Sequence, residues 1–103
     1  MTAPRKIAFA RIADTAQRQA DAIVGRWLPE GKRDGAEWVA KNPRRNDQRL
    51  GSFKVNLRTG RWSDFAVDRS GGDLISLAAY LFNLSQVDAA KRVAEMLGIP
   101  PYE

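Results

Sequence analysis

The chain has 103 residues, enough for one domain with its own core and short tails. With 44% hydrophobic and 28% charged residues it has the composition of a folded globular domain, and no apolar run approaches the ~18 residues that a membrane span needs. Cysteine and histidine are absent, which excludes disulfides, thiolate zinc sites, cysteine nucleophiles and histidine acid–base catalysis. The polar start does not resemble a signal peptide, so we expect a cytoplasmic protein without metal or other cofactor.

The positive charge is concentrated in one segment. The net charge is +5, yet between positions 41 and 61 seven basic residues stand against one acid, Asp47. This concentration is typical of a surface that binds a polyanion, although a solvated basic loop without a partner would have the same composition. The basic residues of the segment are Lys41, Arg44, Arg45, Arg49, Lys54, Arg58 and Arg61.

A first helix is predicted over residues 15–27. Asp14 can serve as its N-cap, with Gln17 three residues later in a capping-box pattern, and Pro29 forces Leu28 out of the helical region. Apolar residues recur at helical spacing, and we expect this stripe to pack on the chain's own sheet. The stripe consists of Ile12, Ala16, Ala20, Ile23, Val24 and Trp27.

A short strand and a hairpin are predicted next. Alternation over residues 36–40 predicts the strand, and the polar segment 41–50 is predicted to be a loop. From Ser52 onward the pattern alternates with a period of two, so one set of side chains faces the core and the other faces solvent. The core set is Phe53, Val55 and Leu57; the solvent set is Ser52, Lys54, Asn56 and Arg58.

Gly60 marks the turn of this hairpin, but the residues leave two registers open. A two-residue turn would place Lys54 opposite Phe65. A three-residue loop with Gly60 in the left-handed conformation would place Lys54 opposite Asp64 instead. We favour the second register because the third residue of such a loop has the left-handed conformation, which favours glycine.

In either register Trp62 and Phe65 fall on opposite faces of the return strand, because their separation is odd. One of the two rings must then share a surface with Lys54, Asn56 and Arg58, unless a bulge buries both. An aromatic ring exposed among cations is typical of a surface that binds single-stranded nucleic acid. A base stacks on the ring, at about 1–3 kcal/mol, and the cations contact phosphates.

Two helices are predicted in the last third of the chain. The segment 70–72 could offer backbone N–H groups to a phosphate, but a carboxylate at Asp73 would occupy them, so we interpret this segment as the start of a helix capped by Asp73 or Gly72. The apolar face of that helix consists of Leu74, Ile75, Leu77, Ala78, Leu81 and Phe82.

The last helix has clear sequence boundaries. Ser85 and Asp88 form a capping-box pattern at its start, and Gly98 followed by Pro100 ends it. Its apolar stripe is Val87, Ala90, Val93, Ala94 and Leu97. The predicted fold class is therefore α+β: an N-terminal helix, a small antiparallel sheet and two C-terminal helices.

The order of four segments resembles the N-terminal zinc-ribbon domain of DnaG-type primases, and is closest to the versions in phage and plasmid primase-helicases. The segments are GKRDGAEW, SFKVNLRTGRWSDF, SGGDLISLAAYL and SQVDAAKRVAEMLGI, and they extend over residues 31–99, roughly two-thirds of the chain. We therefore treat the chain as a single domain, 1–103, with residues 1–30 as a helical extension and 31–99 as a ribbon-like core.

The resemblance implies a ribbon that contacts single-stranded template DNA. Family members hold zinc with three cysteines and a histidine, none of which this chain has, so apolar packing around Trp38, Trp62 and the N-terminal helix would replace the metal. The catalytic domain of a primase is missing, so we do not expect primer synthesis by this chain alone. The template-contacting strand carries over to Lys54, Asn56, Arg58, Arg61 and Trp62.

We expect a non-enzymatic domain that binds single-stranded DNA, an accessory to a primase or helicase in phage or plasmid replication, with no membrane association. The alternative is a protein-interaction module, an inhibitor or adaptor whose basic hairpin face binds an acidic partner. No nucleophile–base pair supports an enzyme, and no catalytic or metal-binding residues are predicted. The predicted nucleic-acid contacts are Lys41, Arg44, Arg45, Arg49, Lys54, Asn56, Arg58, Arg61, Trp62 and Phe65.

Overall fold

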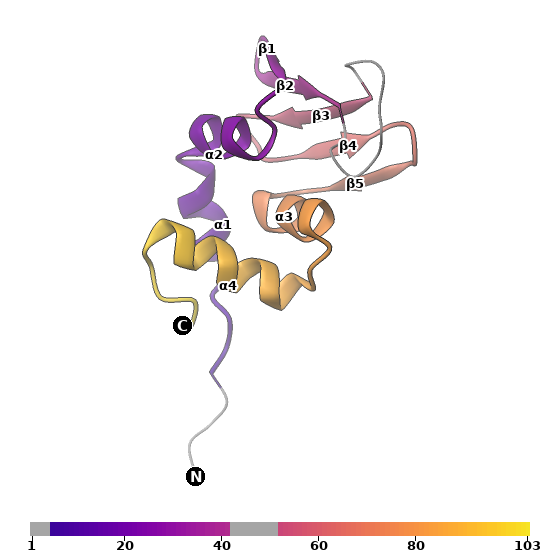
Figure 1. Ribbon diagram of the computed structural model, residues 1–103. Coiled ribbons are helices and arrows are strands. Elements are labelled where there is room, and N and C mark those ends of the chain that lie inside the picture. Colours follow the sequence, from indigo (N-terminus) through magenta and orange to yellow (C-terminus); the bar gives the residue numbers. More distant parts are fainter. Residues whose placement is uncertain (1–4, 42–51) are drawn as a thin grey trace.

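The computed structural model describes residues 5–41 and 52–103, which form four helices and a five-stranded antiparallel sheet (Figure 1). The predicted α+β class is confirmed. Consecutive strands are neighbours, in the order β1-β2-β3-β4-β5. The helices are α1 (Phe9–Gln17), α2 (Ala20–Trp27), α3 (Leu74–Phe82) and α4 (Gln86–Leu97), and the strands are β1 (Lys32–Asp34), β2 (Glu37–Ala40), β3 (Phe53–Asn56), β4 (Trp62–Asp64) and β5 (Arg69–Gly71).

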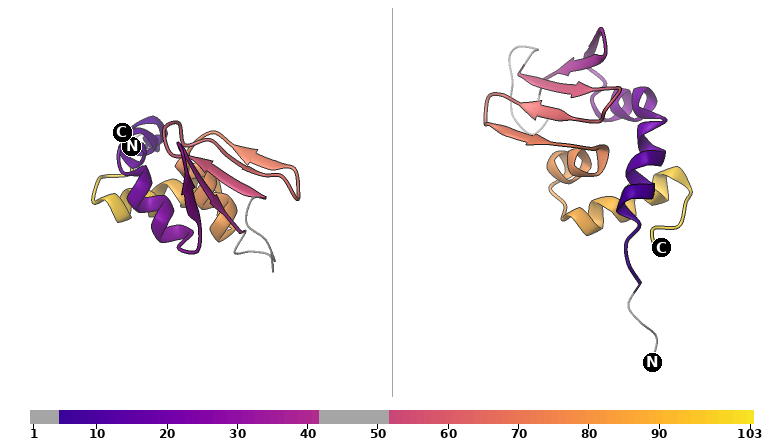
Figure 2. Two further views of the ribbon diagram at one scale, coloured as in Figure 1. Left: turned by 90° about the horizontal axis from the view of Figure 1, so that it is seen from above. Right: turned by 180° about the vertical axis from the view of Figure 1, so that it is seen from behind.

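The helices gather on one side of the sheet (Figures 1 and 2). Phe53 and Val55 of β3 and the adjoining Leu57 are buried, as their alternation predicts. They join one hydrophobic cluster that also contains Ile12 of α1 and Leu77 of α3. Because the helices cover one face, we call the buried side of the sheet the inner face and the opposite side the outer face.

The predicted N-terminal helix is in fact two helices, α1 and α2, separated at Arg18 and Gln19. The first begins at Phe9, and no side chain caps it. Its start is instead held by the C-terminal segment, where the Ala8 N–H donates to the Pro101 carbonyl at 2.9 Å. The predicted cap Asp14 lies inside α1 and pairs with Arg18. The apolar stripe continues across the break, so periodicity alone could not reveal it.

The predicted caps of α3 and α4, Asp73 and Ser85, are confirmed, and the reciprocal bond that completes a capping box is present at α3. The Asp73 carboxylate accepts from the Ser76 N–H at 2.8 Å in a capping box, and the Ser85 hydroxyl accepts from the Asp88 N–H at 3.1 Å. Gly98 adopts the left-handed conformation with a φ of 72°. Two predicted core residues are exposed instead: Phe82 and Val87.

Strands β1 and β5 were not predicted. Both are three residues long and largely exposed, and each pairs with one neighbour only, so no apolar alternation marks them. The residues interpreted as a helix start are therefore shared: Arg69–Gly71 completes the sheet, and Asp73 then caps α3.

The β3–β4 hairpin has neither of the two expected registers. Val55 pairs with Trp62 and Lys54 with Ser63, which leaves a four-residue loop, residues 57–60. Gly60 has the expected left-handed conformation, with a φ of 81°. The longer loop is stabilised by Asn56, whose side-chain oxygen accepts from the N–H groups of Arg58 and Thr59 at 2.9 and 3.1 Å.

Candidate nucleic-acid interface

Trp62 and Phe65 lie on opposite faces of the sheet, as their odd separation predicts. Trp62 is only 4% exposed, whereas Phe65 is 66% exposed. The Trp62 indole stacks on Tyr80 of α3, with ring centroids 4.8 Å apart, and on Phe53 at 5.9 Å. Its Nε1 donates to the Ser76 hydroxyl at 2.9 Å. The assignment of Trp62 to nucleic-acid contact is therefore wrong, because its ring belongs to the core.

Gly71 explains how β5 approaches this indole. A Cβ atom at Gly71 would overlap the Trp62 ring and the Ser76 hydroxyl. Only glycine lets the last residue of β5 lie against the ring while Ser76 still caps α3. The glycine therefore serves packing of the inner face.

The strand register arranges the outward side chains in rows across the outer face. Val39, Lys54, Ser63 and Ser70 form the central row, with Lys32 at its β1 end. Lys54 and Ser63 lie between buried neighbours, so by alternation this row faces away from the helical core. The outer face is thus a polar surface with cations spaced across it.

Phe65 and Lys54 are the residues that this surface brings together. The Lys54 ammonium lies 6.0 Å from the centroid of the Phe65 ring, within cation–π range. The Phe65 backbone is anchored, because its N–H donates to the Ser52 carbonyl at 2.8 Å. By alternation Lys41, which directly follows β2, is placed on the same face, at the end near Ser52. This end of the sheet combines an exposed ring with cations.

The opposite end of the outer face is less suited to an anion. Arg61 pairs there with Asn56, whose N–H donates to the Arg61 carbonyl at 2.7 Å, but Glu37 lies on the other side of Asn56 and Asp34 beyond it. Two carboxylates beside one guanidinium weaken the local positive potential. The Asn56 side-chain oxygen, predicted to contact nucleic acid, caps the hairpin loop, and Arg58 is exposed in that loop.

Three of the predicted contact residues, Arg44, Arg45 and Arg49, lie outside the described residues. The structure adds three outer-face residues that were not predicted, Lys32, Ser63 and Ser70. The turn between β1 and β2 consists of Gly35 and Ala36, with Gly35 at a φ of 62°. Glycine at the first position of a two-residue turn is a hairpin signal, which could have revealed β1 and its lysine.

The acidic residues that the structure describes near the interface do not form a metal site. Asp64 is fully buried and accepts from the Tyr80 hydroxyl at 2.8 Å and the Ala66 N–H at 3.3 Å. Within residues 5–41 and 52–103, no three His, Cys, Asp or Glu side chains are close enough together to hold a metal ion.

None of the described helices is both long and apolar enough to cross a membrane.

Comparison with known proteins identifies no relative: neither a protein-family model nor a curated protein matches this chain. The resemblance to primase zinc ribbons therefore remains a prediction from the sequence.

Proposed function

We propose that this chain binds single-stranded nucleic acid on the outer face of its sheet, with Phe65 as the stacking ring and Lys54 as the nearest phosphate contact. The observation that carries the proposal is the exposed Phe65 ring beside Lys54 on a polar sheet face. Single-strand binding surfaces combine these two elements, because every base has an aromatic face and every nucleotide a phosphate.

The position of Phe65 supports a role outside the core. The β3–β4 and β4–β5 hairpins both have four-residue loops. The first loop follows Asn56 and ends at Gly60, and the second follows Asp64 and ends at Asp68; both end residues have the left-handed conformation. The first residue of the earlier loop, Leu57, follows the outward-facing Asn56 and is buried, with 6% exposure. The equivalent residue of the later loop, Phe65, follows the inward-facing Asp64 and therefore faces outward. Packing therefore does not require a phenylalanine here.

A single strand suits this surface better than a duplex. Stacking on Phe65 needs an unpaired base with its face free, and a duplex hides its base faces inside the stack. No described helix projects from the outer face, so a helix inserted into the major groove is not available there. The role of DNA-replication accessory to a primase or helicase rests on the sequence resemblance and extends this proposal.

A direct test compares a labelled 12-nucleotide single strand with the matching duplex, by fluorescence anisotropy at two salt concentrations. We expect tighter binding to the single strand and a steep loss of affinity as salt rises. Binding that is equal for both forms would contradict single-strand recognition. Absence of binding at low salt would contradict nucleic-acid binding altogether and favour an acidic protein partner for this face.

A further inference from the structure

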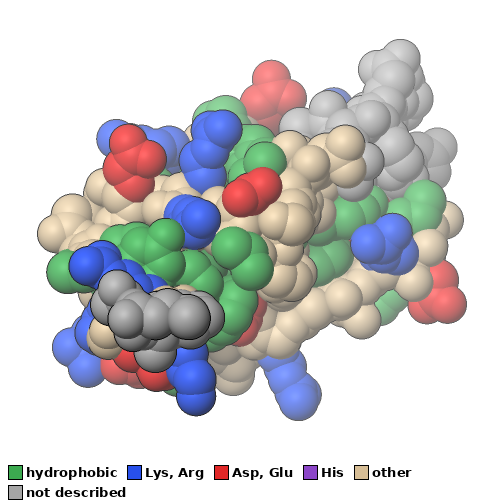
Figure 3. All heavy atoms as spheres, turned by 90° about the horizontal axis from the view of Figure 1, so that it is seen from below, with side chains coloured by type: hydrophobic (Ala, Val, Ile, Leu, Met, Phe, Trp, Pro, Cys, Tyr) green, Lys and Arg blue, Asp and Glu red, His purple; other side chains and the backbone are tan. Residues whose placement is uncertain are grey.

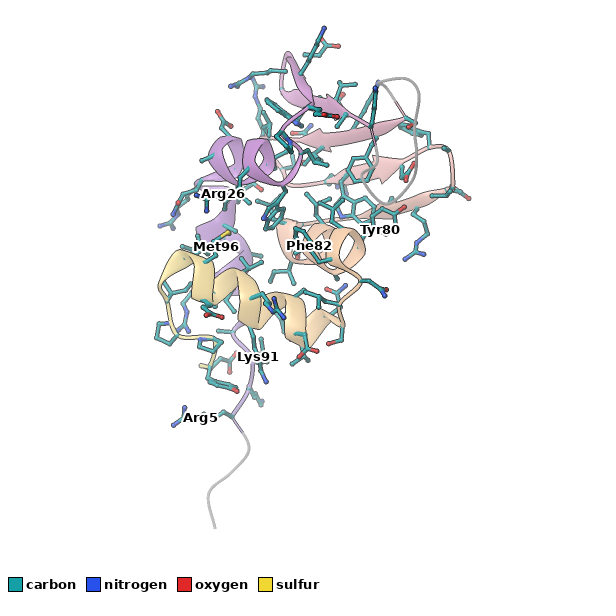
Figure 4. All side chains as sticks on the ribbon, in the orientation of Figure 1. Arg5, Arg26, Tyr80, Phe82, Lys91 and Met96 are labelled. Carbon is teal, nitrogen blue, oxygen red and sulfur yellow. The ribbon has the colours of Figure 1, made fainter. Side chains whose placement is uncertain are left out.

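An apolar groove lies between α2 and α4, on the helical side of the molecule. Its main hollow has a volume of about 330 Å³ and is lined largely by Trp27, Phe82, Leu84, Arg92 and Met96. A second hollow of about 190 Å³ shares Met96 and continues along α2 to Arg26. In Figure 4 the labelled Arg26, Met96 and Phe82 follow this groove between the two helices. The volume of the main hollow is at the lower end for ligand pockets.

The groove exposes apolar side chains that the helices could have buried. Phe82 is 51% exposed and Met96 37% exposed, although the sequence pattern of α3 assigns Phe82 to the core. The Phe82 ring meets Trp27 edge to face, with centroids 5.7 Å apart, so the two rings together form one wall of the groove. Figure 3 shows the molecule from below Figure 1, the side on which α4 lies, and hydrophobic side chains are exposed there among both basic and acidic ones.

The charge of the groove has one sign. Arg92 lines the main hollow and Arg26 the second, and no Asp or Glu among the described residues lines either. The described ion pairs join Arg18 to Asp14 and Arg33 to Asp21, so neither groove arginine has an acidic partner among the residues that the structure describes. Two exposed guanidinium groups are thus available to carboxylates from another molecule.

We propose that this groove binds an acidic peptide segment of a partner protein, with one large apolar side chain in the main hollow and carboxylates on Arg92 and Arg26. Aromatic and methionine side chains with arginine at the edge are the composition of protein-binding hot spots. The site is separate from the nucleic-acid surface, because it lies on the helical side of the sheet.

Other occupants fit the groove less well. A second copy of this chain carries a net charge of +5, so self-association over an arginine-lined groove is opposed by like charge. Nucleic acid would meet a mainly apolar lining in the main hollow, where Arg92 is the one cation among the described lining residues. An acidic segment with an apolar side chain matches both the apolar lining of the main hollow and the positive charge of Arg92 and Arg26.

The test selects 12-residue peptides from a displayed random library on the immobilised full chain. We expect the selected peptides to combine Asp or Glu with Leu, Phe or Trp. One selected peptide, labelled and followed by anisotropy, should lose at least about tenfold in affinity for the double variant R26E/R92E. The matched control K91E reverses a charge on the same helix beside Tyr102 and should change affinity less than about twofold.

Several results would overturn the proposal: no enrichment, enrichment of basic peptides, or equal affinity for R26E/R92E and the wild type. A concentration-dependent dimer that R26E/R92E abolishes would show that the occupant is a second copy, which also contradicts it. Peptide binding should be unaffected by Phe65→Ala. Sensitivity to Phe65→Ala would place the peptide on the outer sheet face and not in the groove.

Discussion

Trp62 and Phe65 lie three positions apart, yet the Trp62 indole lies in the core, stacked on Tyr80, and the Phe65 ring faces solvent beside Lys54. The two aromatic residues of the return strand therefore differ in their surroundings, one buried and one exposed. Trp62 links β4 to α3 through a hydrogen bond to Ser76, and we propose Phe65 as a ligand contact. Substitutions at the two positions should therefore have different effects on stability and on binding.

Replacing Phe65 with alanine should weaken single-strand binding by 1–3 kcal/mol, about 5- to 150-fold, because the stacking ring is lost. Thermal stability should change little, since the ring is mostly exposed. Phe82→Ala makes the same change on the helical side and should leave oligonucleotide affinity unchanged. Anisotropy titrations of both variants check this, and a similar loss for both would contradict the assignment of Phe65.

Removing cations from the outer face should reduce the salt dependence of binding. For single strands the slope of log K against log salt is about −0.7 per neutralised phosphate, so Lys54→Gln should make the slope shallower by about 0.7, if Lys54 contacts one phosphate. The double variant R58A/R61A extends the test to the hairpin loop. Lys91→Gln, on α4, is the control and should keep the wild-type slope.

Mutation of Trp62 should act on stability and not on ligand contact. Trp62→Ala removes a buried aromatic side chain and should cost about 3–5 kcal/mol of unfolding free energy, measured by urea denaturation. The milder Trp62→Phe keeps a ring in the stack and should bind the oligonucleotide as the wild type does wherever it is folded. A loss of affinity in folded Trp62→Phe would restore Trp62 as a contact residue.

Adjacent glycines provide a matched pair for the packing of β5. Gly71→Ala should destabilise the fold by about 1–3 kcal/mol, because the added Cβ overlaps Trp62 and Ser76. Gly72→Ala should be nearly neutral, because no atom lies within 4 Å of its added Cβ. Equal effects on the urea midpoint would mean that close approach to the indole is not the reason for Gly71.

Local signals predicted the fold where local chemistry determines it. Side chains of Asp73 and Ser85 cap α3 and α4 as their spacing indicates, and Phe53 and Val55 are buried by strict alternation. The start of α1 was not predictable in this way, because a backbone contact from Pro101, far along the chain, holds it. The hairpin loop is stabilised by hydrogen bonds that the Asn56 side chain accepts from Arg58 and Thr59. A prediction based on the position of glycine alone does not take these bonds into account.

The candidate site was only partly predictable from the sequence, because its arrangement depends on which residues of neighbouring strands pair. Parity required one aromatic ring on the outer face, but only the pairing of Val55 with Trp62 determines that this ring is Phe65. Charge counting could not show that Glu37 lies beside Asn56, because that contact depends on the register between β2 and β3. Sequence thus predicted a basic aromatic surface, and tertiary pairing determined its centre.

Stacking of a base on residue 65 can be measured with the substitution Phe65→Trp, which places a fluorescent ring at that position. The native tryptophans, Trp27, Trp38 and Trp62, are buried or lie on the helical side of the sheet, so their emission should change little when an oligonucleotide binds. In the variant, saturating single strand at low salt should quench the added emission strongly. Unchanged emission from the variant, while anisotropy shows that the strand is bound, would contradict stacking on residue 65.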